Sequence, residues 1–404
     1  MRYNSSMSKK ILPIILLLPI TLLAYLFISY PHTSVLKSSY YLMNHIINPH
    51  AKLNKHVMGF LPYWHIDNMQ YVKPEMLSEI NYFGLTAGKD GKLLTIVDNQ
   101  TDPGWREWNR ESTKDFVTKS KIMGTEVSLT VTAQKNKIIE SLLDSPTSQA
   151  TLVSQILEQI KTRSLNGINI DFEYLGDVDK EYKNKFTDFT KLLHEKIQKE
   201  SPKTKLSLSI MPLAGREKDL FDLKKIAPYF DRFIGMSYDY YGASSEIAGP
   251  VAPMKGFKEN KYFFDVQTSY EDYLKVVPKE KIIMGIPYYG WDFAVVDGKK
   301  IQSKTFPQDD PKNYAAVMSY GRMKESADLK PNQCQWDDYA LATWCWYTKD
   351  DVDHQVWLED NKSLGIKFDF AEQKNLGGIA IWVLGYDKDY PDLWNMLKGK
   401  FGEK

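Results

Sequence analysis

Short apolar runs alternate along the chain with amphipathic stretches. Turn residues bound the runs, which is typical of buried strands. In the stretches between several of them, apolar residues recur every three to four positions, as on one face of a helix. Strands are predicted over Val57–Trp64, Ile80–Thr86, Glu126–Thr132, Asn166–Tyr174, Lys205–Ile210, Arg232–Tyr238, Lys281–Pro287 and Gly377–Leu384. Helices are predicted over Thr113–Met123, Thr147–Arg163 and Lys180–Lys199, with a short one at the C-terminus.

This alternation continues over more than 300 residues and predicts an α/β protein with a parallel sheet. Eight strand-helix units predict a closed (β/α)8 barrel, the TIM barrel, over residues 57–404. The alternative is a doubly wound open sheet. That fold would usually carry a glycine-rich phosphate turn after its first strand, and the chain has none there.

The connection between the seventh and eighth strands is too long for a loop and a helix. It spans about 90 residues, and residues 291–357 within it are rich in β-formers and turn residues. We therefore expect a small inserted α+β subdomain on the upper face of the barrel. Cys334 and Cys345 flank an aromatic stretch in it that could fold as a hairpin. They form either a disulfide or two packed free thiols, and no histidine pair accompanies them to make a metal site.

The N-terminal segment differs from the rest. Ile11–Ile28 runs 18 residues without a charge, after Arg2, Lys9 and Lys10. We interpret residues 1–30 as an uncleaved signal anchor that crosses the membrane, followed by a stem over residues 31–56. A cleaved signal peptide and a buried helix are the alternatives. Basic residues before the span place the N-terminus in the cytoplasm. Both leading interpretations put the catalytic region outside it, membrane-anchored or secreted.

The composition and net charge limit the classes of ligand and partner that we expect. The net charge is +1, from 52 basic and 51 acidic residues, so there is no field to attract nucleic acid. The aromatic fraction of 13% is high, with 10 Trp and 25 Tyr. These rings either fill a large core or offer flat surfaces to a ligand with flat apolar faces, such as a sugar.

The strand over Asn166–Tyr174 carries the most informative chemistry. Successive strand side chains point to opposite faces, so Asn169, Asp171 and Glu173 share one face. The other face is apolar, with two isoleucines and a phenylalanine. The two acids are spaced about 6.6 Å apart along the strand. Carboxylates in a row repel one another, and acid chemistry at the end of a strand is the simplest reason to keep them.

In barrels of this kind the active site lies at the C-terminal ends of the strands. Those ends also carry Tyr63, Trp64, Met211, Tyr238, Asp239, Tyr288, Tyr289 and Trp382. Carboxylates, phenols and indoles in one cleft are suited to gripping a sugar and breaking its bond. Phosphate chemistry would call for arginines or a metal cluster at these ends, so we expect neither a metal nor a cofactor.

These residues resemble the motifs of glycoside hydrolase family 18, the chitinases and related N-acetylglucosaminidases. The family signature D-x-x-D-x-D-x-E on the fourth strand aligns with Asn166, Asn169, Asp171 and Glu173. Three further motifs follow in register. Met236–Asp239 resembles M-x-Y-D, Gly285–Gly290 resembles G-x-P-x-Y-G, and Gly378–Trp382 resembles G-x-x-x-W. The resemblance covers roughly Val57–Leu397, and the insertion lies where the family has one.

The resemblance implies the mechanism. Glu173 would be the general acid, and the nucleophile would be the 2-acetamido oxygen of the substrate, an exception to the two-carboxylate scheme. Asp171 would orient that group, and its charge would raise the pKa of Glu173. Tyr238 would donate to the acetamido oxygen. The expected result is hydrolysis of β-linked N-acetylglucosamine glycans with retention of configuration. The substrate-binding candidates are Asn169, Asp239, Met236, Trp382, Tyr63, Trp64, Tyr289 and Met211.

The chain also departs from the family pattern. Asn stands in place of Asp at positions 166 and 169, and Ser128–Val131 replaces the usual S-x-G-G. The Asn169 amide cannot ionise but can donate a hydrogen bond to Asp171. We therefore predict that Asp171 stays anionic over a wider pH range. Asn at this position resembles family members that act on bacterial cell-wall glycan, which favours peptidoglycan over chitin.

Two other functional classes remain. A lectin-like sugar-binding protein of the same fold would usually lack the acid, and Glu173 is present. A membrane-tethered scaffold would need the motifs to be coincidence. The sequence leaves open the natural glycan, endo or exo action, and cleavage of the anchor.

Overall fold

The computed structural model describes residues 34–47, 49–216 and 219–403. The signal anchor predicted over residues 1–30 lies outside these residues. Within the described part of the chain, no helix has the length and apolar character needed to cross a membrane. The predicted stem includes helix α2 (Ser34–Ile47). Lys37 of α2 forms an ion pair with Asp115 on a neighbouring helix of the barrel.

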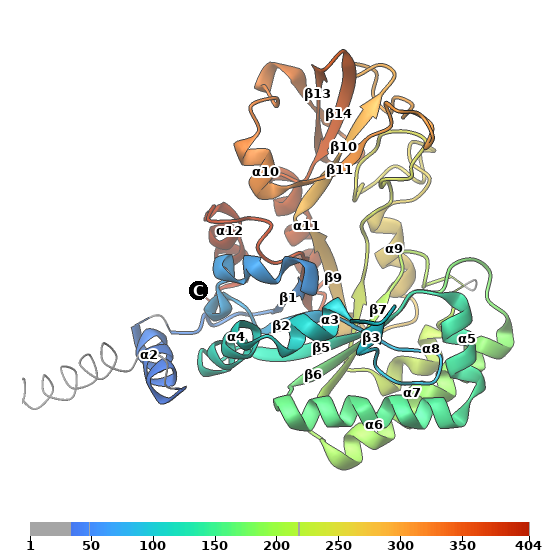
Figure 1. The fold of residues 1–404 in the computed structure, drawn as a ribbon. Coiled ribbons are helices and arrows are strands. Elements are labelled where there is room, and N and C mark those ends of the chain that lie inside the picture. Colours follow the sequence, from blue (N-terminus) through green and yellow to red (C-terminus); the bar gives the residue numbers. More distant parts are fainter. Residues whose placement is uncertain (1–33, 48, 217–218, 404) are drawn as a thin grey trace, which may run out of the picture.

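Eight parallel strands close into a barrel, which confirms the predicted (β/α)8 fold (Figure 1). Around the barrel the order is β1-β15-β9-β8-β7-β6-β5-β2. The predicted strands match the observed ones within a few residues, except that β8 ends three residues before Tyr238. The strands are β1 (His56–Pro62), β2 (Glu79–Thr86), β5 (Glu126–Ala133), β6 (Gly167–Phe172), β7 (Lys205–Ile210), β8 (Arg232–Gly235), β9 (Ile282–Pro287) and β15 (Gly378–Trp382).

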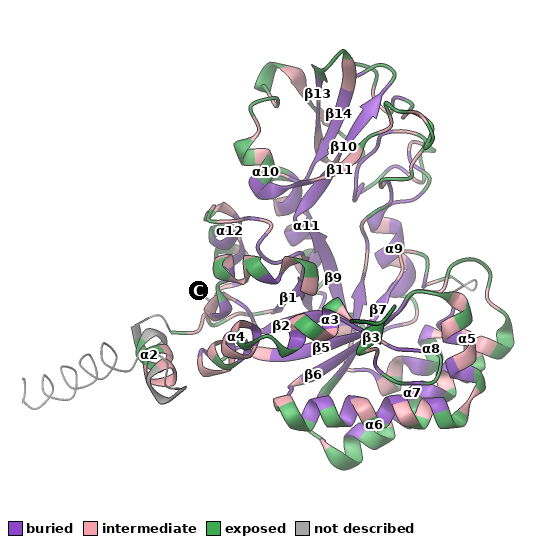
Figure 2. Ribbon diagram, viewed as in Figure 1, coloured by how far each residue is buried: buried purple, intermediate pink, exposed green. Residues whose placement is uncertain are grey.

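Helices cover the outside of the barrel and turn their buried faces towards it (Figure 2). The three helices predicted from apolar spacing correspond to α4, α6 and α7. The helices are α3 (Pro103–Asn109), α4 (Glu111–Ile122), α5 (Asn136–Asp144), α6 (Pro146–Arg163), α7 (Lys180–Glu200), α8 (Leu223–Ile226), α9 (Val266–Tyr273), α11 (Asn361–Gln373) and α12 (Asp392–Phe401). Short 3-10 helices span Tyr63–Tyr71, Pro74–Met76, Ala227–Tyr229, Lys279–Lys281 and Pro331–Gln333, and a small hairpin pairs β3 (Ile96–Val97) with β4 (Gln100–Thr101).

The packing of strand β6 explains why Asp171 and Glu173 face into the barrel. Its apolar side chains at Ile168, Ile170 and Phe172 are fully buried outside the sheet. The Phe172 ring lies 6.1 and 6.0 Å from the rings of Phe186 and Phe189 on α7. Burying this face against the helix fixes the register of the strand, so the alternate residues must point into the barrel.

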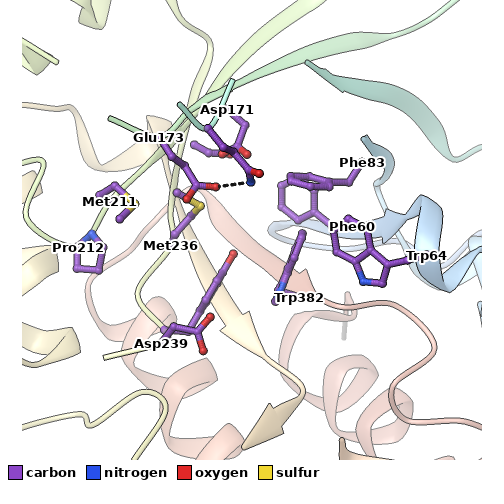
Figure 3. Close-up of a pocket in the computed structure, with 13 residues that line it drawn as sticks. Phe60, Trp64, Phe83, Asp171, Glu173, Met211, Pro212, Met236, Asp239 and Trp382 are labelled. Atoms are coloured by element: carbon purple, nitrogen blue, oxygen red, sulfur yellow. Dashed lines mark hydrogen bonds between the residues drawn. The ribbon is translucent and has the colours of Figure 1, made fainter. Parts of the chain in front are cut away.

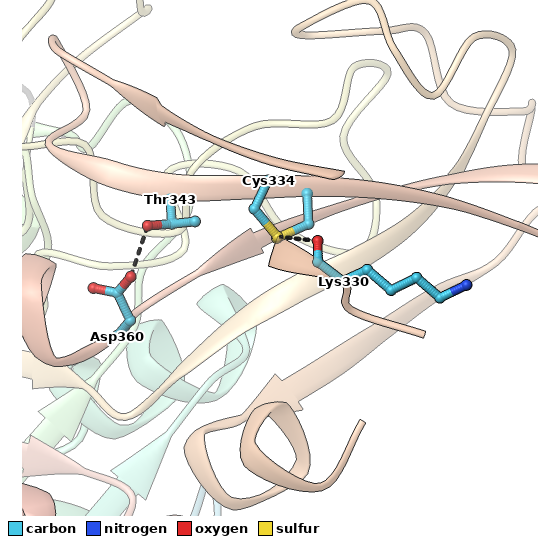
Figure 4. The surroundings of a disulfide bond; sticks show 5 residues. Lys330, Cys334, Thr343 and Asp360 are labelled. Carbon is cyan, nitrogen blue, oxygen red and sulfur yellow. Dashed lines mark hydrogen bonds between the residues drawn. A yellow bond between two sulfur atoms is a disulfide. The ribbon is translucent and has the colours of Figure 1, made fainter. Parts of the chain in front are cut away.

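An inserted subdomain stands between β9 and α11, where it was predicted. It is a five-stranded antiparallel sheet in the order β11-β10-β14-β13-β12 with one short helix. Its elements are β10 (Tyr289–Val295), β11 (Ala315–Ser319), α10 (Tyr320–Glu325), β12 (Cys334–Asp337), β13 (Ala342–Lys349) and β14 (Val352–Leu358). Cys334 and Cys345 lie opposite each other on β12 and β13 and form a disulfide (Figure 4), so the free-thiol alternative does not hold.

A buried charge cluster closes the N-terminal end of the barrel interior. Glu79 on β2 is 2% exposed and accepts hydrogen bonds from Ser128 at 2.5 Å and from Arg232 at 2.9 Å. His56 lies 3.0 Å from the same carboxylate. Burial alone would raise the pKa of Glu79, but the bonds to His56 and Ser128 and the charge of Arg232 hold it at about 2. Glu79 is therefore an anion matched by buried donors.

Replacing Arg232 with methionine leaves the Glu79 carboxylate buried without its cation. We expect Arg232→Met to lower the free energy of unfolding by roughly 3–5 kcal/mol. The control is Lys205→Met on the neighbouring strand. Its partner is Asp231, and the two side chains are 48% and 32% exposed. That change should cost below about 1 kcal/mol. Urea unfolding measures both, and equal losses would contradict the structural role of the buried cluster.

Candidate active site

A hollow of about 240 Å³ opens at the C-terminal ends of the barrel strands (Figure 3). One side is aromatic and the other carries the acids of β6. The residues that line it are Phe60, Trp64, Phe83, Gln134, Asp171, Glu173, Ser209, Met211, Pro212, Met236, Tyr238, Asp239 and Trp382. The barrel therefore brings together residues from seven of its eight strands or their following loops.

The aromatic side is built around Trp382 at the end of β15. Its ring packs edge-on against Phe83 at 4.9 Å, Phe60 at 5.6 Å and Trp64 at 6.2 Å between ring centroids. The ring of Tyr238 lies nearly parallel to it, at 6.2 Å and 10° between planes. Neighbours on several sides hold the indole in place, so it forms a rigid wall on which the apolar face of a sugar ring can pack.

Asp171 is the buried acid of the hollow. It is 1% exposed, and neither carboxylate oxygen has a hydrogen-bond partner among the described residues. Burial raises the pKa of Asp171 to about 8, and the charge of neighbouring Glu173 acts in the same direction. The Ser209 hydroxyl opposes this to a smaller extent. A buried, unpartnered carboxyl that faces a hollow is a group prepared for a ligand donor.

Glu173 is the more accessible acid. It follows the last residue of β6, and its backbone N–H donates to the Ala133 carbonyl at 2.9 Å. The Gln134 amide donates to Glu173 Oε1 at 3.0 Å, and the Glu173 carboxyl points into the hollow (Figure 3). One carboxyl oxygen is thus held by the protein, and the other is available to carry a proton.

Most sequence-predicted site residues meet in this hollow. Besides the two acids, Trp64, Met211, Met236, Tyr238, Asp239 and Trp382 line it. Asp239 has a left-handed backbone with φ of 55°, and it accepts a hydrogen bond from the Trp291 indole at 3.0 Å.

Three candidates do not line the hollow, and they are Asn169, Tyr63 and Tyr289. The Tyr63 ring instead covers Gly84, where an added Cβ would lie 2.4 Å from a ring carbon. Tyr289 is buried beside Tyr238, with ring centroids 6.5 Å apart.

Five lining residues were not predicted from the sequence. They are Phe60, Phe83, Gln134, Ser209 and Pro212. Phe60 and Phe83 lie within strands, whereas the predicted site includes only residues at strand ends. On β2, Glu79 and Asn81 also point into the barrel and precede Phe83 at two-residue spacing, so strand alternation could have placed Phe83 inside. The register irregularity of β2 lies after Phe83. Gln134 directly follows β5, the third predicted strand. Counting the end of that strand among the site-forming ends would have included Gln134 in the predicted site.

Comparison with known proteins agrees with this geometry. Residues 32–387 match the family model described as glycosyl hydrolases family 18. The chain belongs to this family. It is 27% identical over 268 residues to a cortical fragment-lytic enzyme of Bacillus subtilis, over 64% of this chain and 55% of that protein. It is 24% identical over 283 residues to a di-N-acetylchitobiase of Mus musculus, over 64% of this chain and 74% of that protein. The chain thus spans only about half the length of the bacterial relative.

Solved family 18 structures share the fold. A Group IV chitinase of Ostrinia furnacalis, in complex with allosamidin, superposes with a TM-score of 0.72 at 18% identity, over 86% of this chain and 98% of that one. A spore cortex-lytic enzyme of Bacillus megaterium gives 0.65 at 21% identity, over 87% and 75%. At these identities the likeness establishes the fold. The family match assigns the chain to glycosyl hydrolases family 18.

The structure corrects the predicted role of Asn169. Its amide donates to Ser209 at 2.9 Å and to Thr130 at 3.3 Å, and its oxygen accepts from Ser207 at 3.1 Å. It therefore makes no hydrogen bond to Asp171. Thr130 and Ser207 stand directly beside Asn169 on β5 and β7. Asp171 is two residues further along the same strand, about 6.6 Å away, so the hydroxyls of the neighbouring strands are closer partners.

The pKa prediction for Asp171 is also corrected. The prediction that Asp171 stays anionic over a wider pH range is wrong, because its pKa is raised to about 8. Asp171 is the fully buried acid of the two. Two carboxylates this close disfavour a doubly charged state, so the pair keeps one proton at neutral pH.

Asp171 should make folding less favourable as the pH rises. In the unfolded chain it ionises near pH 4, and in the native protein near pH 8. Between these values ionisation favours the unfolded state, so stability is lost with rising pH. We expect Asp171→Asn to raise the free energy of unfolding by roughly 2 kcal/mol or more at pH 8 and by little at pH 4.

Urea unfolding at the two pH values measures this difference. Asp188→Asn, on the exposed face of α7, is the matched control and should change stability little at either pH. An equal effect of Asp171→Asn at both pH values would contradict the burial argument.

Proposed function

We propose that this protein hydrolyses β-linked N-acetylglucosamine glycans of bacterial peptidoglycan, with retention of configuration, by substrate-assisted catalysis. The observation that carries the proposal is the buried Asp171 carboxyl, whose oxygens have no hydrogen-bond partner at normal distance among the described residues and which faces the hollow beside Glu173. An acetamido N–H is a donor of the right kind to fill that position. A sugar without an N-acetyl group would leave the carboxyl unpaired, at a cost in binding.

The geometry supports an ordered set of roles. The sugar packs on the Trp382 indole, its acetamido N–H donates to Asp171, and the Tyr238 hydroxyl donates to the acetamido oxygen. That oxygen attacks the anomeric carbon while the glycosidic bond breaks. The resulting oxazolinium ion carries a positive charge, which favours the anionic form of Asp171 despite its burial.

Glu173 acts first as the general acid and then as the general base. When the bound acetamido N–H stabilises Asp171 as an anion, the one proton of the pair moves to Glu173. Because Gln134 donates to Oε1, that proton is carried on Oε2 and passes to the leaving glycosidic oxygen. The resulting carboxylate then takes a proton from a water molecule that attacks the anomeric carbon and opens the oxazolinium ring. Two displacements at the same carbon restore its original configuration. The Glu173 carboxyl in the hollow favours this enzyme over the lectin-like alternative.

Peptidoglycan is the favoured glycan for two reasons. Asn169 resembles the residue found in family members that act on cell-wall glycan, and one relative is a cortical fragment-lytic enzyme. We also propose that the barrel works outside the cytoplasm, anchored or secreted through residues 1–30. The Cys334–Cys345 disulfide supports that placement, because such bonds persist in oxidising compartments.

The role of Glu173 is tested by Glu173→Gln, which keeps the shape and removes the proton. We expect kcat on N-acetylglucosamine oligomers and on purified peptidoglycan to fall roughly a thousandfold or more, as for loss of a general acid. Glu195→Gln, on the exposed face of α7, is the matched control and should keep full activity. Mass spectrometry of the products measures both. A fully active Glu173→Gln variant would refute the mechanism.

The role of the acetamido group is tested through the substrate. Glucosamine oligomers lack the internal nucleophile and should not be cleaved, whereas N-acetylglucosamine oligomers should give the β-anomer first. Proton NMR during the first turnovers distinguishes the anomers before they equilibrate. An α-anomer as first product would exclude the retaining route.

A further inference from the structure

Two hydroxyl side chains flank Asp171 on the neighbouring strands of the barrel. On β5, Thr132 is the register partner of Asp171. On β7, Leu208 is the register partner of Ile170, so the next residue, Ser209, comes beside Asp171. Ser209 is 3% exposed and lines the hollow. The sheet therefore offers the Asp171 carboxyl one hydroxyl group from each side.

The proton of Thr132 is already in use. Its hydroxyl donates to the Thr86 oxygen on β2 at 3.3 Å. A hydroxyl group has one proton to donate. Of the two flanking hydroxyls, Ser209 is thus the one that can donate to Asp171.

Asn169 decides where the Ser209 proton points. Its amide nitrogen donates to the Ser209 oxygen at 2.9 Å and to the Thr130 oxygen at 3.3 Å. Its oxygen accepts from the Ser207 hydroxyl at 3.1 Å, and the Thr130 hydroxyl donates onward to Asn81 at 2.5 Å. All hydrogen-bonding groups of the amide are therefore occupied. Because the Ser209 oxygen accepts from Asn169, its own proton must point to a different acceptor.

Asp171 is the acceptor that is left for this proton. Among the described residues, no other hydrogen bond of normal length involves the Ser209 hydroxyl, and neither Asp171 oxygen has one. Burial raises the pKa of Asp171 to about 8, and the Ser209 hydroxyl acts against that rise. Asp171 is therefore protonated at neutral pH in the free protein. A carboxylate attracts a hydroxyl proton more strongly than a neutral carboxyl does, so the bond strengthens when Asp171 ionises.

No cation in the hollow could perform this task. Among the described residues that line it, none is Lys, Arg or His. Glu173, on the same strand side, raises the pKa of Asp171 by its charge. After β8, burial and nearby acids hold the pKa of Tyr238 well above its ordinary value, and burial raises the pKa of Asp239 against its bond from Trp291. The flanking strands β5 and β7 add only the two hydroxyls, so an Asp171 anion depends on neutral donors.

We propose that Asn169 and Ser209 form a relay that holds a hydrogen-bond donor ready for the ionised form of Asp171. In the complex, the acetamido N–H of the sugar donates to one Asp171 oxygen from the hollow, and the Ser209 hydroxyl donates to the other. With both donors in place, the proton of the acid pair resides on Glu173. Asn169 and Ser209 are thus positioning residues. This inference rests on the proposed function, because it takes Asp171 as the partner of the acetamido group.

The relay gives a role to the departure from the family pattern at position 169. An amide nitrogen can only donate, so Asn169 leaves the Ser209 proton free for Asp171. A carboxylate at this position would accept that proton and take the donor away from Asp171.

A titration of the free protein tests the relay without any substrate. We expect Ser209→Ala to raise the pKa of Asp171 by about one pH unit, because the anion loses its donor. Carbon-13 NMR of protein labelled at the aspartate carboxyls measures this pKa, and the signal that is missing in Asp171→Asn identifies the residue. Thr132→Val is the matched control, since Thr132 is 4% exposed and flanks Asp171 on the other side. It should leave the pKa unchanged. An unchanged pKa in Ser209→Ala, or an equal rise in both variants, would overturn the proposal.

Kinetics test the relay in the complex. Asp171 must ionise while Glu173 keeps its proton, so Ser209→Ala should move the acidic limb of the kcat profile on N-acetylglucosamine oligomers to higher pH. Below that limb kcat should fall about tenfold, which corresponds to one pH unit. Ser209→Thr keeps the hydroxyl and should restore most of kcat and the original profile, and Thr132→Val should leave the profile in place. A loss of kcat in Ser209→Ala without a displaced profile would show a merely structural role and contradict the relay.

Failure of the relay can be told apart from failure of the proposed function. A raised pKa of Asp171 in Ser209→Ala supports the relay even in a protein that cleaves no glycan, which would refute the proposed function alone. An unmoved pKa refutes the relay even where Glu173→Gln abolishes hydrolysis as expected.

Discussion

Two carboxyl groups, Asp171 on strand β6 and Glu173 directly after it, are the constraint on which the site depends. Their backbone positions are set by the sheet, so they cannot move apart to relieve their repulsion. Asp171 is buried without a hydrogen-bond partner at normal distance among the described residues, and Glu173 is held at one oxygen by Gln134. The pair keeps one proton at neutral pH, and the proposed hydrolysis uses that proton for the leaving group.

The rest of the barrel maintains this arrangement. The apolar face of β6 is buried against α7, which fixes the strand register and turns the acids inward. Beneath them, Asn169 joins the hydroxyls of Thr130, Ser207 and Ser209 in a polar layer. That layer holds β6 to its neighbours but leaves both Asp171 oxygens without a hydrogen bond of normal length. The Glu79 and Arg232 pair closes the interior at the opposite end.

The aromatic side and the acidic side of the hollow have different proposed roles. In the proposed function, the rings around Trp382 hold a sugar by packing, and the acids act on its glycosidic bond. The inserted subdomain begins directly after β9, and its Trp291 binds Asp239 at the mouth of the hollow. A loop of the barrel and the first strand of the insertion therefore meet at a residue that lines the hollow.

The sequence by itself determined the barrel, the place of the insertion and the inward row of Asn169, Asp171 and Glu173. Those features follow from periodicity along a single segment, which local sequence records directly. Only the tertiary structure decided that Asn169 bonds sideways, that Gln134 holds Glu173, and that Phe60 and Phe83 complete the aromatic wall. Each of these contacts joins residues from different strands or from the loops that follow them. Neighbouring strands of a closed barrel can lie far apart in the sequence, so the order of residues along the chain does not give the distance between their side chains.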